Sequence, residues 1–252
     1  MKTNRSYSYG DGFFETIRMR GGNWLYVSQH LERIISGLQA LQFSPEFEID
    51  IDWLNQTING ALDSSEFADD QDVVVRLDFY RMGERGYLPS NDSLHTETVV
   101  SPIDNSTDGI FPDRVEDLGD LIEQMKESDA LQFSVASSVM KQSSSVGHLK
   151  STSAITYVQA ALENQQRGLD DLLLLNTQKR VCEFISSNIL LVFNDELYAV
   201  PRSDGPVDGT MISALREKFG MKIRSFRIDQ LDRADLILSC NSVRGIHRMM
   251  RA

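Results

Sequence analysis

The sequence predicts an α+β protein of two domains, with a smaller N-terminal α/β domain over residues 1–115 and a larger, barrel-like C-terminal domain over residues 116–252. In the first half, segments with helical periodicity alternate with segments rich in strand-forming residues. In the second half, several short apolar segments follow one another between polar turns, which is typical of a barrel-like or strongly curved sheet. Residues 101–112 are rich in Pro, Asp, Ser and Asn, so we expect irregular structure there and a boundary between residues 101 and 131.

The composition excludes several classes of protein. Hydrophobic residues make up 41% and charged residues 25% of the 252 residues, as is ordinary for a soluble globular chain. The net charge of −12 makes nucleic acid or an anionic membrane an unfavourable partner. Cys182 and Cys240 stand in apolar segments without metal-ligand spacing, which predicts core packing in a reducing compartment and no metal site. Without an apolar segment near Met1, or a run of about 20 apolar residues elsewhere, we expect a cytoplasmic protein.

The elements expected in the first half begin with a β-hairpin over residues 12–27, which turns at residues 21–23. Ser28 is then the expected N-cap of a helix, and a second helix over residues 51–62 leads into a strand over residues 73–81. The first helix has apolar residues at the spacing of one buried face, namely Leu31, Ile34, Ile35, Leu38 and Leu41.

The second half should contain more strands than helices. We expect helices over residues 115–126 and 152–167, the latter ended by Gly168, and a third helix after Gly209. The expected strands cover residues 131–140, 171–175, 181–183, 188–193, 197–200 and 234–240.

Lys150 is the candidate for a covalent anchor. It is expected to end an apolar strand and open an amphipathic helix, and Glu183 follows 33 residues later at the end of a buried strand. If the lysine holds pyridoxal phosphate as a Schiff base, a carboxylate is needed to keep the pyridine nitrogen protonated. On periodicity alone, most such lysines are solvated surface charges. Lys141 is a competing anchor that lacks the following helix and the spacing to Glu183.

Six stretches of the chain form an ordered set of landmarks: residues 9–18, residues 30–33, Lys150, Glu183 with Asn188, residues 208–210, and residues 241–242. In this order they resemble the landmarks of the class IV aminotransferases. These fold-type-IV pyridoxal-phosphate enzymes include branched-chain and D-amino acid aminotransferases and aminodeoxychorismate lyase.

The resemblance implies a set of cofactor contacts. Lys150 would form the Schiff base with pyridoxal 5′-phosphate, and Glu183 would pair with the ring nitrogen. The remaining implied cofactor residues are Arg33, Asn188, Gly209, Thr210, Met211 and Ser242. The sequence alone favours a solvated helix arginine for Arg33 and an ordinary capped helix after Gly209, although backbone N–H groups at a helix start can hold a phosphate. Met211 stands where a family threonine is usual.

The substrate side of the resemblance favours the lyase group. The stretch from Arg85 to Tyr87 and the stretch from Cys240 to Ile246 look like that group, whereas Glu15 stands where some lyases carry a hydroxyl residue. The expected reaction converts 4-amino-4-deoxychorismate to 4-aminobenzoate and pyruvate. The alternatives are a branched-chain or D-amino acid aminotransferase and, less favoured, a protein that binds the cofactor without turnover.

The resemblance also suggests which residues would contact a small amino substrate. Lys150 would be the general base and Thr16 a hydroxyl helper, and Arg81 or Arg85 would bind a substrate carboxylate through the bidentate guanidinium geometry. Tyr9 and Asn241 complete the expected substrate contacts. A homodimer is expected, with the cofactor in a cleft between the two halves of the chain.

Overall fold

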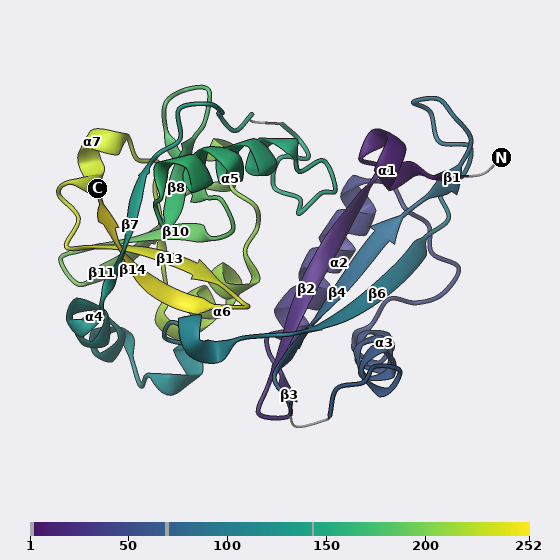
Figure 1. Cartoon of the computed structure of the whole chain (residues 1–252), viewed down its shortest axis with the longest axis horizontal. Helices are drawn as coiled ribbons and strands as arrows, with labels where there is room; N and C mark the ends of the chain where they lie inside the picture. Colours follow the sequence, from purple (N-terminus) through teal and green to yellow (C-terminus); the bar gives the residue numbers. More distant parts are fainter. Residues whose placement is uncertain (1–2, 69–70, 143) are drawn as a thin grey trace. The chain divides into compact units, whose positions relative to one another are not determined.

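The computed structural model describes residues 3–68, 71–142 and 144–252. The chain forms two compact units. The first unit contains Met1–Ser106 and the short segment Leu149–Ser153, and the second contains Thr107–His148 and Ala154–Ala252. The sequence-based division at residue 115 places that short segment with the second half, so the return of Leu149–Ser153 to the first unit was not anticipated. Figure 1 shows the ribbon of both units.

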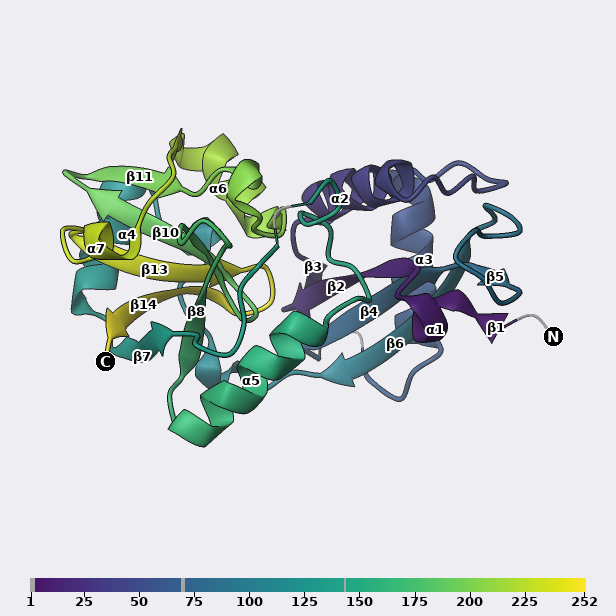
Figure 2. The ribbon, with the colours of Figure 1, turned by 90° about the horizontal axis from the view of Figure 1, so that it is seen from above.

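A four-stranded antiparallel sheet in the order β3-β2-β4-β6 forms the frame of the first unit. Alternate residues of β2 and β4 pack against residues of α2 and α3 in one hydrophobic cluster. Figure 2 shows the ribbon of these helices and strands. The elements are β1 (Thr3–Asn4), α1 (Arg5–Tyr9), β2 (Gly12–Arg20), β3 (Asn23–Trp24), α2 (Val27–Ala40), α3 (Ile51–Asp63), β4 (Val73–Tyr80), β5 (Met82–Gly83), β6 (His95–Pro102) and the 3-10 turn η1 (Asn105–Thr107).

The first unit differs from the expectation in three places. The helix α2 begins at Val27 after Tyr26, whose backbone is left-handed, so Ser28 is not its N-cap. Its buried face includes His30 and excludes Ile35, which is 37% exposed. The edge strand β6 was not expected because nearly all its side chains are exposed and it has no apolar alternation.

An eight-stranded sheet in the order β12-β11-β10-β13-β14-β7-β8-β9 forms the second unit. A further pairing between β9 and β10, at Glu183 and Asn188, closes six of these strands into a barrel. The strands are β7 (Ala130–Val135), β8 (Asp171–Leu175), β9 (Val181–Phe184), β10 (Asn188–Phe193), β11 (Glu196–Ala199), β12 (Lys222–Ile223), β13 (Leu236–Asn241) and β14 (Gly245–Arg251). The helices are η2 (Pro112–Arg114), α4 (Leu118–Glu127), α5 (Ile155–Arg167), η3 (Arg202–Asp204), α6 (Thr210–Phe219) and α7 (Ile228–Leu231).

Most elements predicted for the second unit are present, with shifted ends. The helix α4 begins only after Asp117, whose side chain accepts a hydrogen bond from the backbone N–H of Asp120 at 2.9 Å. Gly168 ends α5 in the left-handed conformation, as predicted. The strand β14 was not expected from its mixed polar sequence, and it completes the barrel between β13 and β7.

Both cysteines are free and buried, which confirms their assignment to the core. Within the described ranges, none of the helices has both the length and the apolar character needed to cross a membrane.

Glu163 ties α5 to the segment that follows β7. Its carboxylate accepts hydrogen bonds from the backbone N–H groups and hydroxyls of Ser137 and Ser138, at 2.6 to 3.1 Å. Arg167, one turn along the helix, donates to the same carboxylate at 2.9 Å. Burial acts to raise the pKa of Glu163, but the hydrogen bonds from Ser138 and Ser137 lower it from the ordinary 4.5 to about 2.

These contacts predict a pH-dependent effect of Glu163→Gln. The folded-state pKa lies below the unfolded one, so the carboxylate stabilises the fold fully above about pH 4.5, and this contribution is lost as the pH falls toward about 2. We expect the variant to have a lower free energy of unfolding than the parent at pH 7, with a difference that shrinks below pH 4.5. Urea unfolding from pH 7 to pH 3 measures it. A constant difference over that range would contradict this role for the carboxylate.

Candidate active site

A buried carboxylate fixes Arg33 in the first unit. Glu15, on β2, is fully buried and accepts hydrogen bonds from Nε of Arg33 at 2.7 Å and from Nη2 at 2.6 Å. Nδ1 of His30 lies 2.7 Å from the same carboxylate. Burial acts to raise the pKa of Glu15, but Arg33 and His30 together lower it to about 2, whereas burial lowers the pKa of His30. The paired carboxylate thus holds the guanidinium in one orientation by two parallel hydrogen bonds.

Lys150 lies beside β2 in the first unit. Its backbone carbonyl accepts a hydrogen bond from the N–H of Phe14 at 2.9 Å, and the N–H of Thr152 donates to Gly12 at 3.0 Å. Nζ of Lys150 is 4.5 Å from the ring centroid of Phe14, and the guanidinium of Arg76 is 3.7 Å from the same centroid. The expectation that Lys150 ends a strand and opens a helix is therefore wrong, because it lies in an extended segment and α5 begins five residues later. The cause is the pairing with β2, which local sequence does not reveal.

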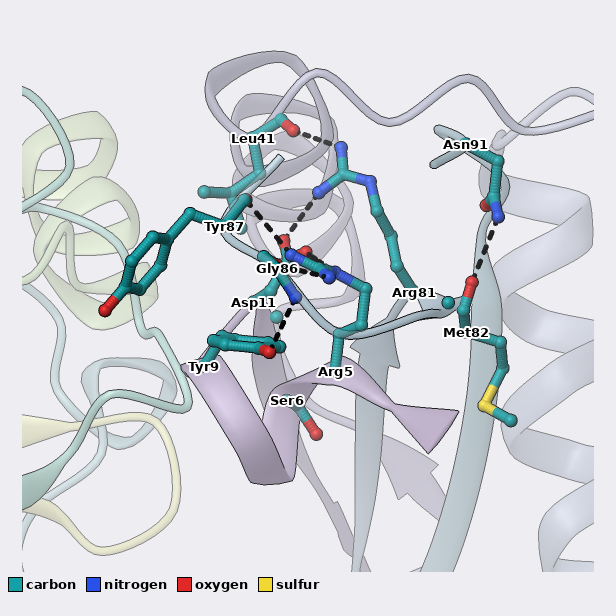
Figure 3. A network of polar contacts seen from close by, with 12 residues as sticks. Arg5, Ser6, Tyr9, Asp11, Leu41, Arg81, Met82, Gly86, Tyr87 and Asn91 are labelled. Atoms are coloured by element: carbon teal, nitrogen blue, oxygen red, sulfur yellow. Dashed lines mark hydrogen bonds and ion pairs between the residues drawn. The ribbon is translucent and has the colours of Figure 1, made fainter. Parts of the chain in front are cut away.

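A polar network holds the loop that carries Arg85 (Figure 3). Arg5 and Arg81 donate to opposite oxygens of Asp11, at 2.8 and 2.6 Å. Arg5 also donates to the carbonyls of Glu84, Gly86 and Tyr87, at 2.9 to 3.2 Å. Two guanidinium groups and one carboxylate thus fix the backbone of this loop.

The two arginines expected to bind substrate, Arg81 and Arg85, have different surroundings in this network. Arg81 is buried, and it donates to the carbonyls of Leu41 and Gln42 at the end of α2 as well as to Asp11. Arg85 is exposed. Arg81 thus supports the loop, and the contact of Arg81 or Arg85 with a substrate carboxylate stays a prediction.

Two other predicted substrate residues lie in the first unit. The hydroxyl of Tyr9 accepts a hydrogen bond from the N–H of Gly86 at 2.8 Å, and its ring lies edge-on to that of Tyr87 at 5.9 Å. Thr16 lies on β2, half-buried, on the same face of the strand as Phe14. Their contact with a substrate stays a prediction.

Glu183 is the centre of the second unit's site. It is 3% exposed, and its Oε1 accepts a hydrogen bond from the hydroxyl of Tyr157 at 2.7 Å and forms an ion pair with Nζ of Lys141 at 2.8 Å. Its Oε2 accepts a hydrogen bond from the N–H of Val207 at 2.8 Å. The Lys141 ammonium also donates to the Tyr157 hydroxyl, and burial together with Glu183 raises the pKa of Tyr157. Glu183 is thus a buried carboxylate with a cation, a hydroxyl and a backbone donor around it.

Asn188 positions the loop that precedes α6. Its side-chain amide donates to the carbonyl of Val207 at 2.8 Å. A Cβ atom at Gly209 would lie 1.9 Å from Oδ1 of Asn188, so a larger residue at that position would require the Asn188 side chain or the loop to shift. Thr210 and Met211 begin α6 and are buried, and among the described residues no side chain caps this helix start. The first N–H groups of α6 are therefore suited to an anion.

Asn241 and Ser242 form the turn after β13. Oδ1 of Asn241 accepts hydrogen bonds from the N–H groups of Val243 and Arg244, at 2.9 and 2.7 Å, and its amide donates to the hydroxyl of Ser187 at 2.9 Å. Ser242 is 7% exposed. Asn241 therefore shapes the turn, and its predicted contact with substrate stays a prediction, as does the phosphate contact of Ser242.

The sequence interpretation missed three groups that the structure places around Glu183. Tyr157 received no role although it belongs to the stretch that follows Lys150, and Lys141 was considered only as an alternative anchor. Val207 contributes its backbone, which no side-chain pattern reports.

Comparison with known proteins places these residues in a family. The sequence model described as amino-transferase class IV matches residues 12–250. The aminodeoxychorismate lyase of Vibrio harveyi is 26% identical over 252 residues, covering 96% of this chain and 83% of the relative.

Solved structures of lyases and aminotransferases are also similar to this chain. The 4-amino-4-deoxychorismate lyase of Pseudomonas aeruginosa is 25% identical with a TM-score of 0.73, covering 98% of this chain and 85% of that one. The branched-chain amino acid aminotransferase of Escherichia coli is 14% identical with a TM-score of 0.77, covering 98% and 78%. At that identity the likeness shows the fold alone.

The contact between Gly209 and Asn188 predicts that Gly209→Ala damages the anion-binding loop. The added methyl group overlaps the Asn188 side chain, so the loop must shift, which we expect to cost about 1–3 kcal/mol of stability and at least tenfold in affinity for pyridoxal phosphate. Urea unfolding and absorbance titration measure the two effects. Gly60→Ala on α3 is the matched control, because open space surrounds that position. Equal affinity in both variants would contradict the assignment of this loop.

Proposed function

Because the chain belongs to the class IV aminotransferases, the fold-type-IV enzymes that depend on pyridoxal phosphate, we propose that it is a lyase that converts 4-amino-4-deoxychorismate to 4-aminobenzoate and pyruvate. The fold predicted from sequence is confirmed by the barrel-like sheet and by the likeness to solved structures of this type. The observation that carries the lyase assignment is the 26% identity to the Vibrio harveyi lyase across nearly the whole chain. The reaction itself is our proposal.

The residues of the second unit fit the cofactor. A buried carboxylate, Glu183, suits a protonated ring nitrogen, and the start of α6 suits a phosphate. These two features are joined through Val207, which donates to Glu183 and precedes Gly209 by two residues. When bound, pyridoxal phosphate supplies an electron sink for the carbon that bears the substrate nitrogen. Glu183 would hold the ring nitrogen, and Gly209, Thr210, Met211 and Ser242 would hold the phosphate.

Lys150 is the residue proposed to anchor the cofactor and to move the proton. With pyridoxal phosphate bound, the free amine of Lys150 would take the proton from the substrate carbon that bears nitrogen. The enolpyruvyl group would leave the neighbouring carbon and take up a proton to become pyruvate, and the remaining ring would become aromatic. The two products contain all atoms of the substrate, so no second substrate is needed. An aminotransferase would require a keto acid to complete its cycle.

The structure favours Lys150 over Lys141 as the anchor. The Nζ of Lys141 is held in a buried ion pair with Glu183, so its use as the anchor would break that pair. Nζ of Lys150 lies instead against the face of an aromatic ring.

The choice between the lysines predicts a simple labelling result. Borohydride reduction of the protein with pyridoxal phosphate should give a stable adduct in the parent and in Lys141→Ala, and none in Lys150→Ala. Mass spectrometry of the peptides locates the adduct. An adduct that persists in Lys150→Ala and disappears in Lys141→Ala would reverse the assignment.

The lyase proposal predicts many turnovers from one substrate. Purified protein mixed with 4-amino-4-deoxychorismate alone should release 4-aminobenzoate continuously, with the near-visible absorbance of the cofactor unchanged after the reaction. Product formation that stops after one equivalent and resumes on addition of a keto acid would show an aminotransferase. A parallel assay with D-alanine or a branched-chain amino acid and 2-oxoglutarate tests that alternative directly.

We also propose a homodimer in the cytoplasm as the working form. A two-fold pair is the commonest oligomer, and the strongly acidic chain gives no reason to expect nucleic acid or a membrane surface as partner.

A further inference from the structure

Lys141 forms an ion pair with Glu183, the carboxylate proposed to hold the protonated ring nitrogen of the cofactor. With the cofactor bound, Glu183 would therefore contact two cations. Lys141 is 7% exposed, and its Nζ lies 2.8 Å from Oε1 of Glu183 and 4.6 Å from the ring centroid of Tyr157. Its backbone N–H donates to the carbonyl of Leu175 at 2.9 Å and fixes the residue beside β8. The proposed reaction assigns it no role.

The contacts of Glu183 do not use the full acceptor capacity of its carboxylate. A carboxylate accepts about four hydrogen bonds. Oε1 lies in an ion pair with Lys141 and accepts a hydrogen bond from Tyr157, and Oε2 accepts one from Val207. Among the described residues, this count leaves one acceptor position on Oε2 for a ring nitrogen while the Lys141 pair is kept.

The surroundings of the pair contain few other charges. Cys182 precedes Glu183 in the sequence and is buried. The charges that act on the Cys182 thiol are those of Glu183, Lys141 and Asp204. Asp204 is in turn paired with Arg180 at 3.3 Å. Lys141 is thus the cation in direct contact with the Glu183 carboxylate within the described part of the second unit.

We propose that Lys141 shares the Glu183 carboxylate with the cofactor's ring nitrogen and thereby limits how strongly that nitrogen holds its proton. A cation beside the carboxylate reduces the negative potential that favours a protonated ring. Lys141 is thus a positioning residue that acts through Glu183. This role rests on the proposed pairing of Glu183 with the ring nitrogen. A weaker electron sink is sufficient where formation of an aromatic product drives the reaction.

The test uses pyridoxine 5′-phosphate, which has the ring nitrogen and the phosphate but no aldehyde to react with a lysine. Isothermal titration in two buffers of different ionisation enthalpy gives both the dissociation constant and the number of protons taken up. In Lys141→Met at pH 8, we expect binding at least threefold tighter than in the parent, with more protons taken up per site. In a Glu183→Gln background, Lys141→Met should change neither quantity.

Two further variants complete the design. Lys141→Gln removes the charge but keeps a hydrogen-bond donor, and it serves if the methionine variant does not fold. Lys179→Met removes a charge from the exposed turn before β9 in the same unit and should leave both quantities unchanged.

The outcomes separate this role from the cofactor assignment. If the parent did not bind pyridoxine 5′-phosphate, the proposed cofactor site would fail. If the parent bound it and both Lys141 variants took up the same number of protons as the parent, only the role of Lys141 would be overturned. Weaker binding in the Lys141 variants, repeated in the Glu183→Gln background, would likewise show a purely structural lysine.

Discussion

The pairing of Glu183 with Asn188 is the constraint on which the second unit's site depends. This pair closes the barrel between β9 and β10, and both side chains then act on one residue, Val207. The N–H of Val207 donates to Glu183 and its carbonyl accepts from Asn188. The loop before α6 is thus fixed on both sides of one peptide segment, and Gly209 is held against the Asn188 side chain. The same two residues therefore close the sheet and position the loop of the proposed phosphate site.

Burial of Glu183 imposes a second condition. An ionised carboxylate at 3% exposure costs several kcal/mol unless charges and hydrogen bonds compensate for the lost water. Tyr157, Lys141 and Val207 provide that compensation from three separate parts of the chain. In the first unit, His30 and Arg33 stabilise the buried carboxylate of Glu15 in the same way. Each unit therefore contains a buried carboxylate that is stabilised by donors from its own unit.

The sequence predicted the fold well where local patterns decide the structure. The helices α3 and α5 and the strands β8 to β10 follow from periodicity and turn residues, and Gly168 ends α5 as expected. The edge strand β6 and the terminal strand β14 were missed because their side chains are exposed or mixed in polarity, and only pairing with distant strands makes them regular.

The site was predicted less completely for the same reason. The resemblance identified the order of Lys150, Glu183 and the loop at Gly209, but it gave no information on which polar groups pair with which. Arg81 is buried, whereas Arg85 is exposed. This difference depends on contacts of Arg81 with Asp11, 70 residues earlier, and with the end of α2. Long-range pairs of this kind leave no periodic signal in a single sequence.

The two lysines show how burial separates similar side chains. Lys141 is nine residues before Lys150, and the two differ in what surrounds the amine rather than in any local motif. The Nζ of Lys141 lies 2.8 Å from the buried carboxylate of Glu183. The Nζ of Lys150 lies instead 4.5 Å from the ring centroid of Phe14. The proposal that Lys150 is the covalent anchor therefore leaves the ion pair of Lys141 with Glu183 intact.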